Sequence, residues 1–146
     1  MIPAWVGAWV GLPYADKGRG PNAFDCWGLA RAVLQAERGI RLPDYAEAYE
    51  SASDPESASR AVMAGLAEGW QKVTVPVVFD LVILAIARRP WHCGIVVAPG
   101  WFLHCPPPHR GNTQTLSCVE RLDSIAWRNR VDGFYRLQNG MENASL

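Results

Sequence analysis

Residues 9–33 read WVGLPYADKGRGPNAFDCWGLARAV and contain the transition that decides the fold. The first half of this stretch is rich in Gly and Pro and predicts a loop. An apolar stripe at helical spacing follows over residues 29–34. We therefore predict a helix with Asp25 as its N-cap and Gly39 at its end, which places Cys26 in the first helical turn.

Two further helices and a surface segment are expected around this stretch. Residues 2–10 carry apolar side chains at near-helical spacing and predict a short opening helix. Residues 41–55 predict an extended crossing of the surface. Residues 55–70 combine a capping signal with Ala, Leu and Met, and they predict a second helix.

The second half of the chain has the short, β-rich runs of an antiparallel sheet. Pro, Gly and polar residues separate these runs, which cover residues 79–86, 91–98, 101–105, 113–119 and 131–137. Residues 120–127 could add one or two helical turns, and residues 139–146 predict a frayed tail. Helices followed by an antiparallel meander make an α+β fold, so we predict a single domain over residues 1–146.

The composition fits a globular domain that buries its own core. Hydrophobic residues make up 49% of the 146 residues and the formal net charge is zero. A balanced charge argues against a nucleic-acid partner, because such proteins normally carry a basic excess. No apolar run is long enough to cross a bilayer, so we expect no membrane insertion. Seven tryptophans are many for this length and favour a cleft or a partner surface.

The N-terminus and the cysteines indicate the compartment in which the chain is made. MIPAWVGAWVGLPY lacks a basic leader and a small-residue cleavage site, so we expect no signal peptide and synthesis in a reducing cytoplasm. The cysteines show no CxxC spacing, and therefore no zinc or thioredoxin signature. They are Cys26, Cys93, Cys105 and Cys118.

Cys26 has the position that a catalytic cysteine needs. At the first turn of a helix, the dipole and the free N–H groups favour a thiolate, and the same groups can stabilise an oxyanion. The alternative interpretation of Cys26 is a small buried core residue. Catalysis would also need a base within hydrogen-bond reach.

Two histidines in the β-rich half could supply that base and its orienting partner. His92 opens one strand and His104 closes the next. A three-residue turn at residues 98–100 would pair position 92 with position 106 and make His104 a diagonal neighbour of His92 on the same face. A two-residue turn would put the histidines on opposite faces. The chemistry therefore predicts an odd-length loop or a bulge in this hairpin.

The same register constrains the neighbouring thiols. Cys93 and Cys105 would lie opposite each other on the face away from the histidines, either as reduced core thiols or as a cross-strand disulfide. His109 lies in a Pro-rich loop and is expected at the rim rather than in catalysis. A zinc site is disfavoured because the nearest thiols alternate away from the histidines, and we predict no metal.

Three motifs in order resemble the NlpC/P60 family of papain-like cell-wall cysteine peptidases. The first is the Pro-Tyr pair, the Gly-rich loop and Asp-Cys-x-Gly-Leu of residues 13–29. The second is an Asp-Leu strand followed by His-x-Gly-Ile, at residues 80–86 and 91–97. The third is the short strand WFLHC, residues 101–105. The resemblance covers residues 5–137 and implies helices packed on an antiparallel sheet.

The resemblance implies a role for each matching residue and no cofactor. Cys26 would be the nucleophile, His92 the general base and His104 the residue that orients the imidazole. Tyr14 matches a family tyrosine that can donate to the oxyanion, although a packing role explains it equally well. Asp25 matches the family aspartate, but its position as a helix cap explains it without any contact to substrate.

A bulky residue follows the nucleophile where the family commonly has serine. Trp27 would reshape the substrate cleft and leaves the preferred bond open. The substrate implied by the resemblance is a peptidoglycan stem peptide, cut at the D-γ-glutamyl–diaminopimelate bond or a nearby bond.

The stretch DCWGLAR…ERGIRLPDY also resembles the version of this domain found in tailed phages and gene-transfer particles. This implies a peptidase carried in a virion at the tail tip, with tail-tip or hub proteins as partners, that opens the host cell wall during DNA entry. One alternative is a mainly structural tail-tip or baseplate protein with weak or latent activity. Another is a cytoplasmic amidase or acyltransferase on the same fold.

Overall fold

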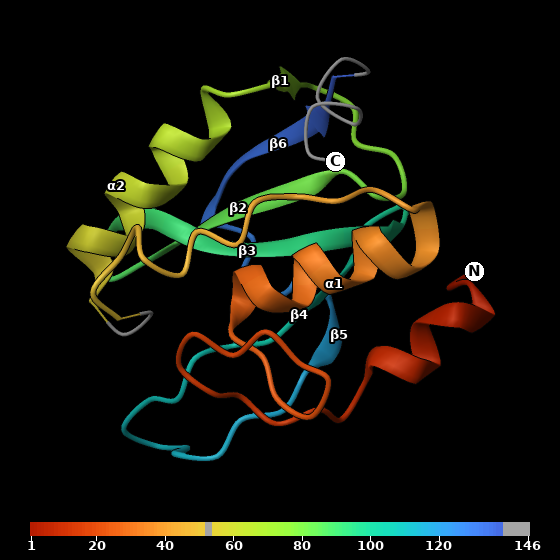
Figure 1. Cartoon of the computed structure of the whole chain (residues 1–146). Coiled ribbons are helices and arrows are strands. Elements are labelled where there is room, and N and C mark those ends of the chain that lie inside the picture. The colour runs from red at the N-terminus through yellow and green to blue at the C-terminus, as the bar shows by residue number, and fades with distance from the viewer. Residues whose placement is uncertain (52–53, 139–146) are drawn as a thin grey trace.

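Helical segments come first along the chain and a single sheet follows (Figure 1). The computed structural model describes residues 1–51 and 54–138. The helices are η1 (Ala4–Trp9, a 3-10 helix), α1 (Cys26–Arg38) and α2 (Pro55–Leu66). The strands are β1 (Trp70–Val73), β2 (Leu81–Ile86), β3 (Arg89–Ala98), β4 (Trp101–His104), β5 (Cys118–Arg121) and β6 (Val131–Leu137). They form one antiparallel sheet in the order β1-β6-β2-β3-β4-β5, which confirms the predicted α+β fold.

The helix that carries Cys26 has the predicted bounds. The Asp25 side chain accepts a hydrogen bond from the backbone N–H of Gly28 at 2.7 Å and caps the helix at its N-terminus. Gly39 ends the helix in the left-handed conformation, with a φ of 67°. The buried side of α1 faces the sheet and packs on β3 and β4.

The Gly-rich loop before α1 folds back onto the first helical turn. The Gly18 carbonyl accepts the backbone N–H of Asp25 at 3.2 Å, and a Cβ at position 28 would lie only 1.9 Å from that same carbonyl oxygen. Residue 28 therefore has to be glycine for the loop to reach the helix. This contact explains both the glycine-rich loop and the glycine two positions after the nucleophile candidate.

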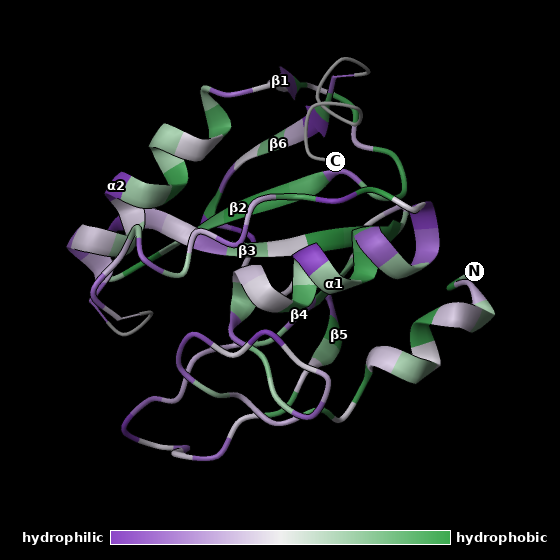
Figure 2. Ribbon diagram, viewed as in Figure 1, coloured by the Kyte–Doolittle hydropathy of each residue, from purple (hydrophilic) through white to green (hydrophobic). Residues whose placement is uncertain are grey.

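The sheet buries side chains on both faces. One face, which includes Ile83, Ile95 and Leu103, packs under α1 and α2 and forms the larger core. The other face forms a smaller cluster that includes Phe102 and is covered by Trp127, from the turns between β5 and β6. Figure 2 shows the resulting hydrophobic colour of β2, which is buried between the two layers.

The β3–β4 hairpin brings the two histidines onto one face by a bulge. Ala98 pairs with Trp101, so the turn at Pro99 and Gly100 has two residues rather than three. The register shifts between Val96 and Ala98, and this bulge restores the pairing of Val96 with Phe102. Of the two predicted alternatives, the structure therefore has the bulge and not the odd-length loop.

Several predicted boundaries were wrong. The second helix ends at Leu66 instead of continuing to residue 70, because the chain turns at Gly69 and enters β1, a strand that the polar sequence WQKV did not reveal. Only the end of the predicted strand 113–119 is regular, since β5 begins at Cys118.

The order of the strands also departs from a simple meander. Residues 122–130 form hydrogen-bonded turns, and β6 then returns across the sheet to pair with β2 and β1. The predicted tail, residues 139–146, lies outside the described residues. Within residues 1–51 and 54–138, no helix has the length and apolar character needed to cross a membrane.

Candidate active site

Cys26 is the first residue of α1 and lies beside β3 at the edge of a cavity. Its side chain is 7% exposed, and the thiol is free, as are those of the other three cysteines. The cavity is open to solvent on one side and has mainly apolar walls. Its lining includes Cys26, Trp27, Tyr45, Tyr49, Trp70, Trp91 and Cys93.

The two predicted histidines lie together in a buried chain of hydrogen bonds. His92 Nε2 is 2.7 Å from His104 Nδ1, and His104 Nε2 is 2.6 Å from Glu120 Oε2. Both imidazoles are fully buried, and both rings pack on the indole of Trp127. The remaining ring nitrogen, His92 Nδ1, is buried and has no hydrogen-bond partner of regular geometry among the described residues.

The electrostatic environment couples Cys26 to this chain. A hydrogen bond from the Cys93 thiol and the neighbouring His92 imidazole lower the pKa of Cys26, although burial alone would raise it. Burial lowers the pKa of His92, and the negative charge that develops on Cys26 acts in the opposite direction. The imidazolium of His92 is therefore stable only when Cys26 has lost its proton, which is the coupling that a thiolate–imidazolium pair requires.

Cys93 lies on the predicted face of β3, away from the histidines, but the expectation that it faces away from the site was wrong. It belongs to the same core cluster as Cys26 and lines the same cavity. Alternation along β3 does separate Cys93 from His92, but the first turn of α1 approaches the strand so that Cys26 interacts with both. That interaction with the protonated Cys93 stabilises the Cys26 thiolate.

We predict that Cys93→Ala makes Cys26 less acidic. A hydrogen bond to a charged group is worth about 1.5–3 kcal/mol, so the midpoint for alkylation of Cys26 should move up by roughly one to two pH units. Peptide mapping of iodoacetamide labelling between pH 4 and pH 9 measures this midpoint. Cys93→Ser, which keeps a donor, and Cys105→Ala should leave it nearly unchanged. Equal midpoints in all three variants would exclude the hydrogen bond.

Tyr14 places a hydroxyl near the nucleophile candidate. Its Oη atom is buried and has no hydrogen-bond partner in the described part of the chain. Burial, and next the charge of Cys26, raise the pKa of Tyr14 well above its usual value, so the hydroxyl stays protonated. A buried, unpaired O–H beside the thiol is a donor without an acceptor in the free protein. This geometry suits an oxyanion donor better than a purely packing role.

Asp25 is occupied by the protein itself. It is 1% exposed, and besides capping α1 it accepts a hydrogen bond from Arg19 Nη1 at 2.9 Å and another from the Tyr49 hydroxyl. Arg19 in turn donates to Tyr49 Oη at 2.7 Å. Although Asp25 borders the cavity, these contacts assign it to holding the loop, the helix and residue 49 together.

Trp27 forms part of the cavity wall, as the sequence predicted. Its indole N–H donates to the Pro43 carbonyl at 3.1 Å, and its ring lies 5.6 Å from that of Tyr45. His109, by contrast, is exposed in the loop between β4 and β5, away from the other histidines. The seven tryptophans are all buried or half-buried, and three of them line the cavity.

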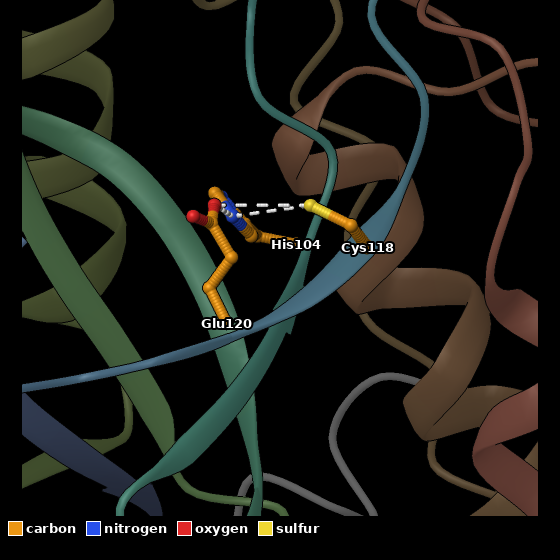
Figure 3. Close-up of side chains that lie close together, drawn as sticks. All are labelled: His104, Cys118 and Glu120. Carbon is orange, nitrogen blue, oxygen red and sulfur yellow. Dashed lines mark hydrogen bonds and ion pairs between the residues drawn. The ribbon is translucent and has the colours of Figure 1, made fainter. Parts of the chain in front are cut away.

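One group of side chains has atoms that could hold a metal ion. His104, Cys118 and Glu120 place a nitrogen, a sulfur and an oxygen within 4.8 Å of one another (Figure 3). These atoms are already joined by hydrogen bonds, at 2.6 Å for His104 and Glu120 and 3.7 Å from Cys118 to each of them. Burial raises the pKa of Cys118 to about 12, which keeps the thiol protonated. In the described structure these three side chains therefore form a hydrogen-bonded cluster.

The order of these elements agrees with a known family. The pattern described as the NlpC/P60 family matches residues 11–136, from the Gly-rich loop to the last strand. The chain belongs to the NlpC/P60 family. Membership covers the helix with Cys26, both histidine strands and the turns that carry Trp127.

One similar protein is much longer than this chain. Protein P54 of Enterococcus faecium is 29% identical over 100 residues, which are 68% of this chain and 16% of P54. This chain therefore spans about a sixth of the length of that relative.

Solved structures with the same fold share little sequence with this chain. The NlpC/p60 domain of the peptidoglycan hydrolase SagA superposes with a TM-score of 0.58 at 21% identity, covering 92% of this chain and 94% of that domain. An NLP/P60 family protein similar to lipoprotein from Staphylococcus aureus gives 0.61 at 20% identity, covering 90% of this chain and 38% of that one. NlpC1 from Trichomonas vaginalis gives 0.62 at 16% identity, covering 90% and 41%. At these identities the likeness establishes the shared NlpC/P60 fold.

The structure also adds residues that sequence reasoning missed in this NlpC/P60 domain. Glu120 joins the histidine chain because β5 pairs with β4 in a register that puts His104 opposite Cys118. Glu120 is then a diagonal neighbour of His104 on the same face. The long connection between these strands hides that register, and only a predicted β4–β5 pairing could have revealed the carboxylate.

Proposed function

We propose that this chain is a cysteine endopeptidase that cleaves peptidoglycan stem peptides, at the D-γ-glutamyl–diaminopimelate bond or a neighbouring bond. The observation that carries the proposal is the electrostatic coupling of Cys26 to the buried imidazole of His92, whose Nε2 contacts His104 and whose Nδ1 has no regular partner in the described structure. Family membership supports the substrate class, since the similar protein SagA is a peptidoglycan hydrolase.

In the proposed reaction, Cys26 is the nucleophile and His92 is the general base. The Cys26 sulfur attacks the carbonyl carbon of the scissile bond while His92 Nδ1 holds the thiol proton. The tetrahedral intermediate collapses to a thioester, and the proton passes from His92 to the leaving amine. Water then attacks the thioester with His92 again as the base, which releases the carboxylic acid and restores the thiol.

The oxyanion of each tetrahedral intermediate needs donors next to the sulfur. The Tyr14 hydroxyl is one donor, because it is buried and without a partner in the described part of the free protein. The backbone N–H of Cys26 is a second, since it precedes the first backbone hydrogen bond of the helix, from Leu29 N–H to the Asp25 carbonyl. Helix α1 thus contributes both the nucleophile and part of the oxyanion site.

The test is digestion of purified sacculi and soluble muropeptides, read by mass spectrometry, with Cys26→Ala as the matched control. We expect the wild-type protein to release stem fragments whose masses identify the bond, and the variant to release none. If neither protein releases fragments from walls of several bacterial types, the domain is not a general wall peptidase. Fragments released equally by both proteins would exclude Cys26 as the nucleophile.

We further propose that the domain acts from a phage tail tip on the host cell wall. The support is the similarity of residues 25–45 to the version carried by tailed phages and gene-transfer particles. Gradient-purified particles from an infected or induced host should contain the chain, and wild-type particles should digest sacculi where particles with Cys26→Ala do not. Particles that assemble and infect equally well with Cys26→Ala would favour the structural tail-tip role. Absence of the chain from particles would refute both roles.

A further inference from the structure

Glu120 ends the chain of hydrogen bonds that begins at His92 and passes through His104. Its side chain is 34% exposed, whereas His104, which it contacts, is fully buried. Glu120 Oε2 lies 2.6 Å from His104 Nε2 and accepts a second hydrogen bond from the Trp127 indole N–H at 3.0 Å. The carboxylate is therefore held in place on the side of His104 that faces away from His92 (Figure 3).

The chemistry of a carboxylate fixes the proton on its partner. The hydrogen bond from His104 lowers the pKa of Glu120, so this group is ionised near neutral pH and can only accept. His104 Nε2 must then carry the proton that lies between the two side chains. Burial lowers the pKa of His104 and favours its neutral form, which leaves Nδ1 without a proton.

The position of the proton on His104 in turn determines the position of the proton on His92. Since His104 Nδ1 can only accept, the hydrogen bond of 2.7 Å between the rings requires a proton on His92 Nε2. Burial also lowers the pKa of His92, and while Cys26 keeps its proton the neutral imidazole has a free lone pair on Nδ1. That atom is the buried ring nitrogen without a regular partner in the described structure, and it belongs to the imidazole that perturbs Cys26.

We propose that Glu120 is a positioning residue that sets the tautomers of His104 and His92, so that His92 presents an unprotonated Nδ1 to Cys26. This inference rests on the proposed peptidase function for its effect on catalysis. The tautomers themselves can be measured without any substrate.

Without an acceptor at position 120, the hydrogen bond between the two histidines can reverse its direction. His104 could then carry its proton on Nδ1 and donate to His92 Nε2, which would put the second proton on His92 Nδ1. A protonated Nδ1 cannot accept the thiol proton of Cys26, and general-base catalysis is lost in that fraction of molecules. The charge of Glu120 also helps to stabilise the imidazolium of His92 when it forms.

The first measurement is a long-range ¹H–¹⁵N spectrum of the histidine rings at neutral pH. In the wild-type protein, the neutral forms of His92 and His104 should both show a protonated Nε2 and a bare Nδ1. Glu120→Leu should populate the reversed arrangement, with protons on Nδ1 of both neutral rings. Glu120→Gln retains an amide oxygen as acceptor and should keep most molecules in the wild-type tautomers. Trp127→Phe removes the indole donor to Glu120 but not the acceptor, and it should leave the tautomers unchanged.

The second measurement is peptidase activity on muropeptides, with kcat and KM determined separately. Glu120→Leu should lower kcat about 100-fold with little change in KM, because general-base catalysis contributes roughly 10²- to 10⁴-fold. Glu120→Gln should retain more of kcat than Glu120→Leu. This order, Glu above Gln above Leu, separates an acceptor role from simple packing.

Two results would overturn the proposal. One is a wild-type spectrum in which neutral His92 carries its single proton on Nδ1, and this result requires no variant to fold. The other is a folded Glu120→Leu protein that keeps the wild-type tautomers and full kcat. If the wild-type protein cleaves no wall material but shows the expected tautomers, the peptidase proposal fails while the assignment of Glu120 as the tautomer-setting residue stands.

Discussion

His92→Ala is expected to lower the rate of stem-peptide cleavage by about 10³- to 10⁴-fold, because the base that accepts the Cys26 proton is removed. The variant should also lose the contribution of the imidazole to the acidity of Cys26, so that labelling of this thiol at pH 6 becomes slower. Initial rates of fragment release, measured by chromatography and mass spectrometry, test the first effect, and peptide-mapped alkylation tests the second.

Three controls make the result on His92 interpretable. His92→Gln refills most of the buried space and can still donate to His104, but it cannot act as a base, so it should be nearly as inactive as the alanine variant. His109→Ala removes an exposed histidine and should leave activity unchanged. Thermal unfolding must show that both His92 variants are folded at the assay temperature. A folded His92→Gln protein with wild-type rates would exclude the proposed base.

Asp25→Ala is expected to have the largest effect on stability. The buried carboxylate caps α1 and pairs with Arg19, whose side chain is 14% exposed. The alanine variant removes the cap and leaves that guanidinium with only its exposed carboxylate partner, Asp44, at 3.0 Å. Breaking a buried ion pair from one side costs about 3–5 kcal/mol. For a chain of this size, this loss should lower Tm by roughly 10–15 °C in calorimetry.

Two further carboxylate variants test whether the burial of Asp25 is the reason for the large expected loss of stability. Glu56→Ala removes an exposed carboxylate that pairs with Arg60 within α2 and should cost less than about 1 kcal/mol. Asp25→Asn keeps the oxygen that caps Gly28 and should fall between the two alanine variants. If Asp25→Ala and Glu56→Ala unfold at the same temperature, the network around Asp25 does not stabilise the fold.

The helix with Cys26 and the histidine pair could be predicted from sequence because local signals define them. Asp25 and Gly39 mark the two ends of α1, and both are read from residue type and position alone. Whether His92 and His104 share a face depends only on whether the short hairpin between them has an odd or an even register. The requirement that the two imidazoles meet predicted an odd-length loop or a bulge. A short connection leaves few registers to consider.

Other parts of the site depend on contacts that no local pattern encodes. The proximity of Cys93 to Cys26 was missed, although its face of the strand was predicted correctly, because alternation along a strand does not tell where a helix end will meet that strand. Glu120 was missed because its place beside His104 depends on pairing across the long connection before β5. The edge strand β1 was missed because the polar sequence WQKV lacks the apolar alternation of a half-buried strand, and its pairing with β6 comes from far along the chain.

The bulge at Val97 has a consequence for how such sequences can change in length. Inserting or deleting one residue between positions 97 and 100 would exchange the faces of His104 and Cys105 relative to β3, and the imidazole would leave the histidine pair. The exposed loop over residues 108–114 carries no comparable constraint. Among descendants of a common ancestor, this hairpin should therefore keep a constant length, while insertions and deletions accumulate a few residues later, in the loop that follows His104.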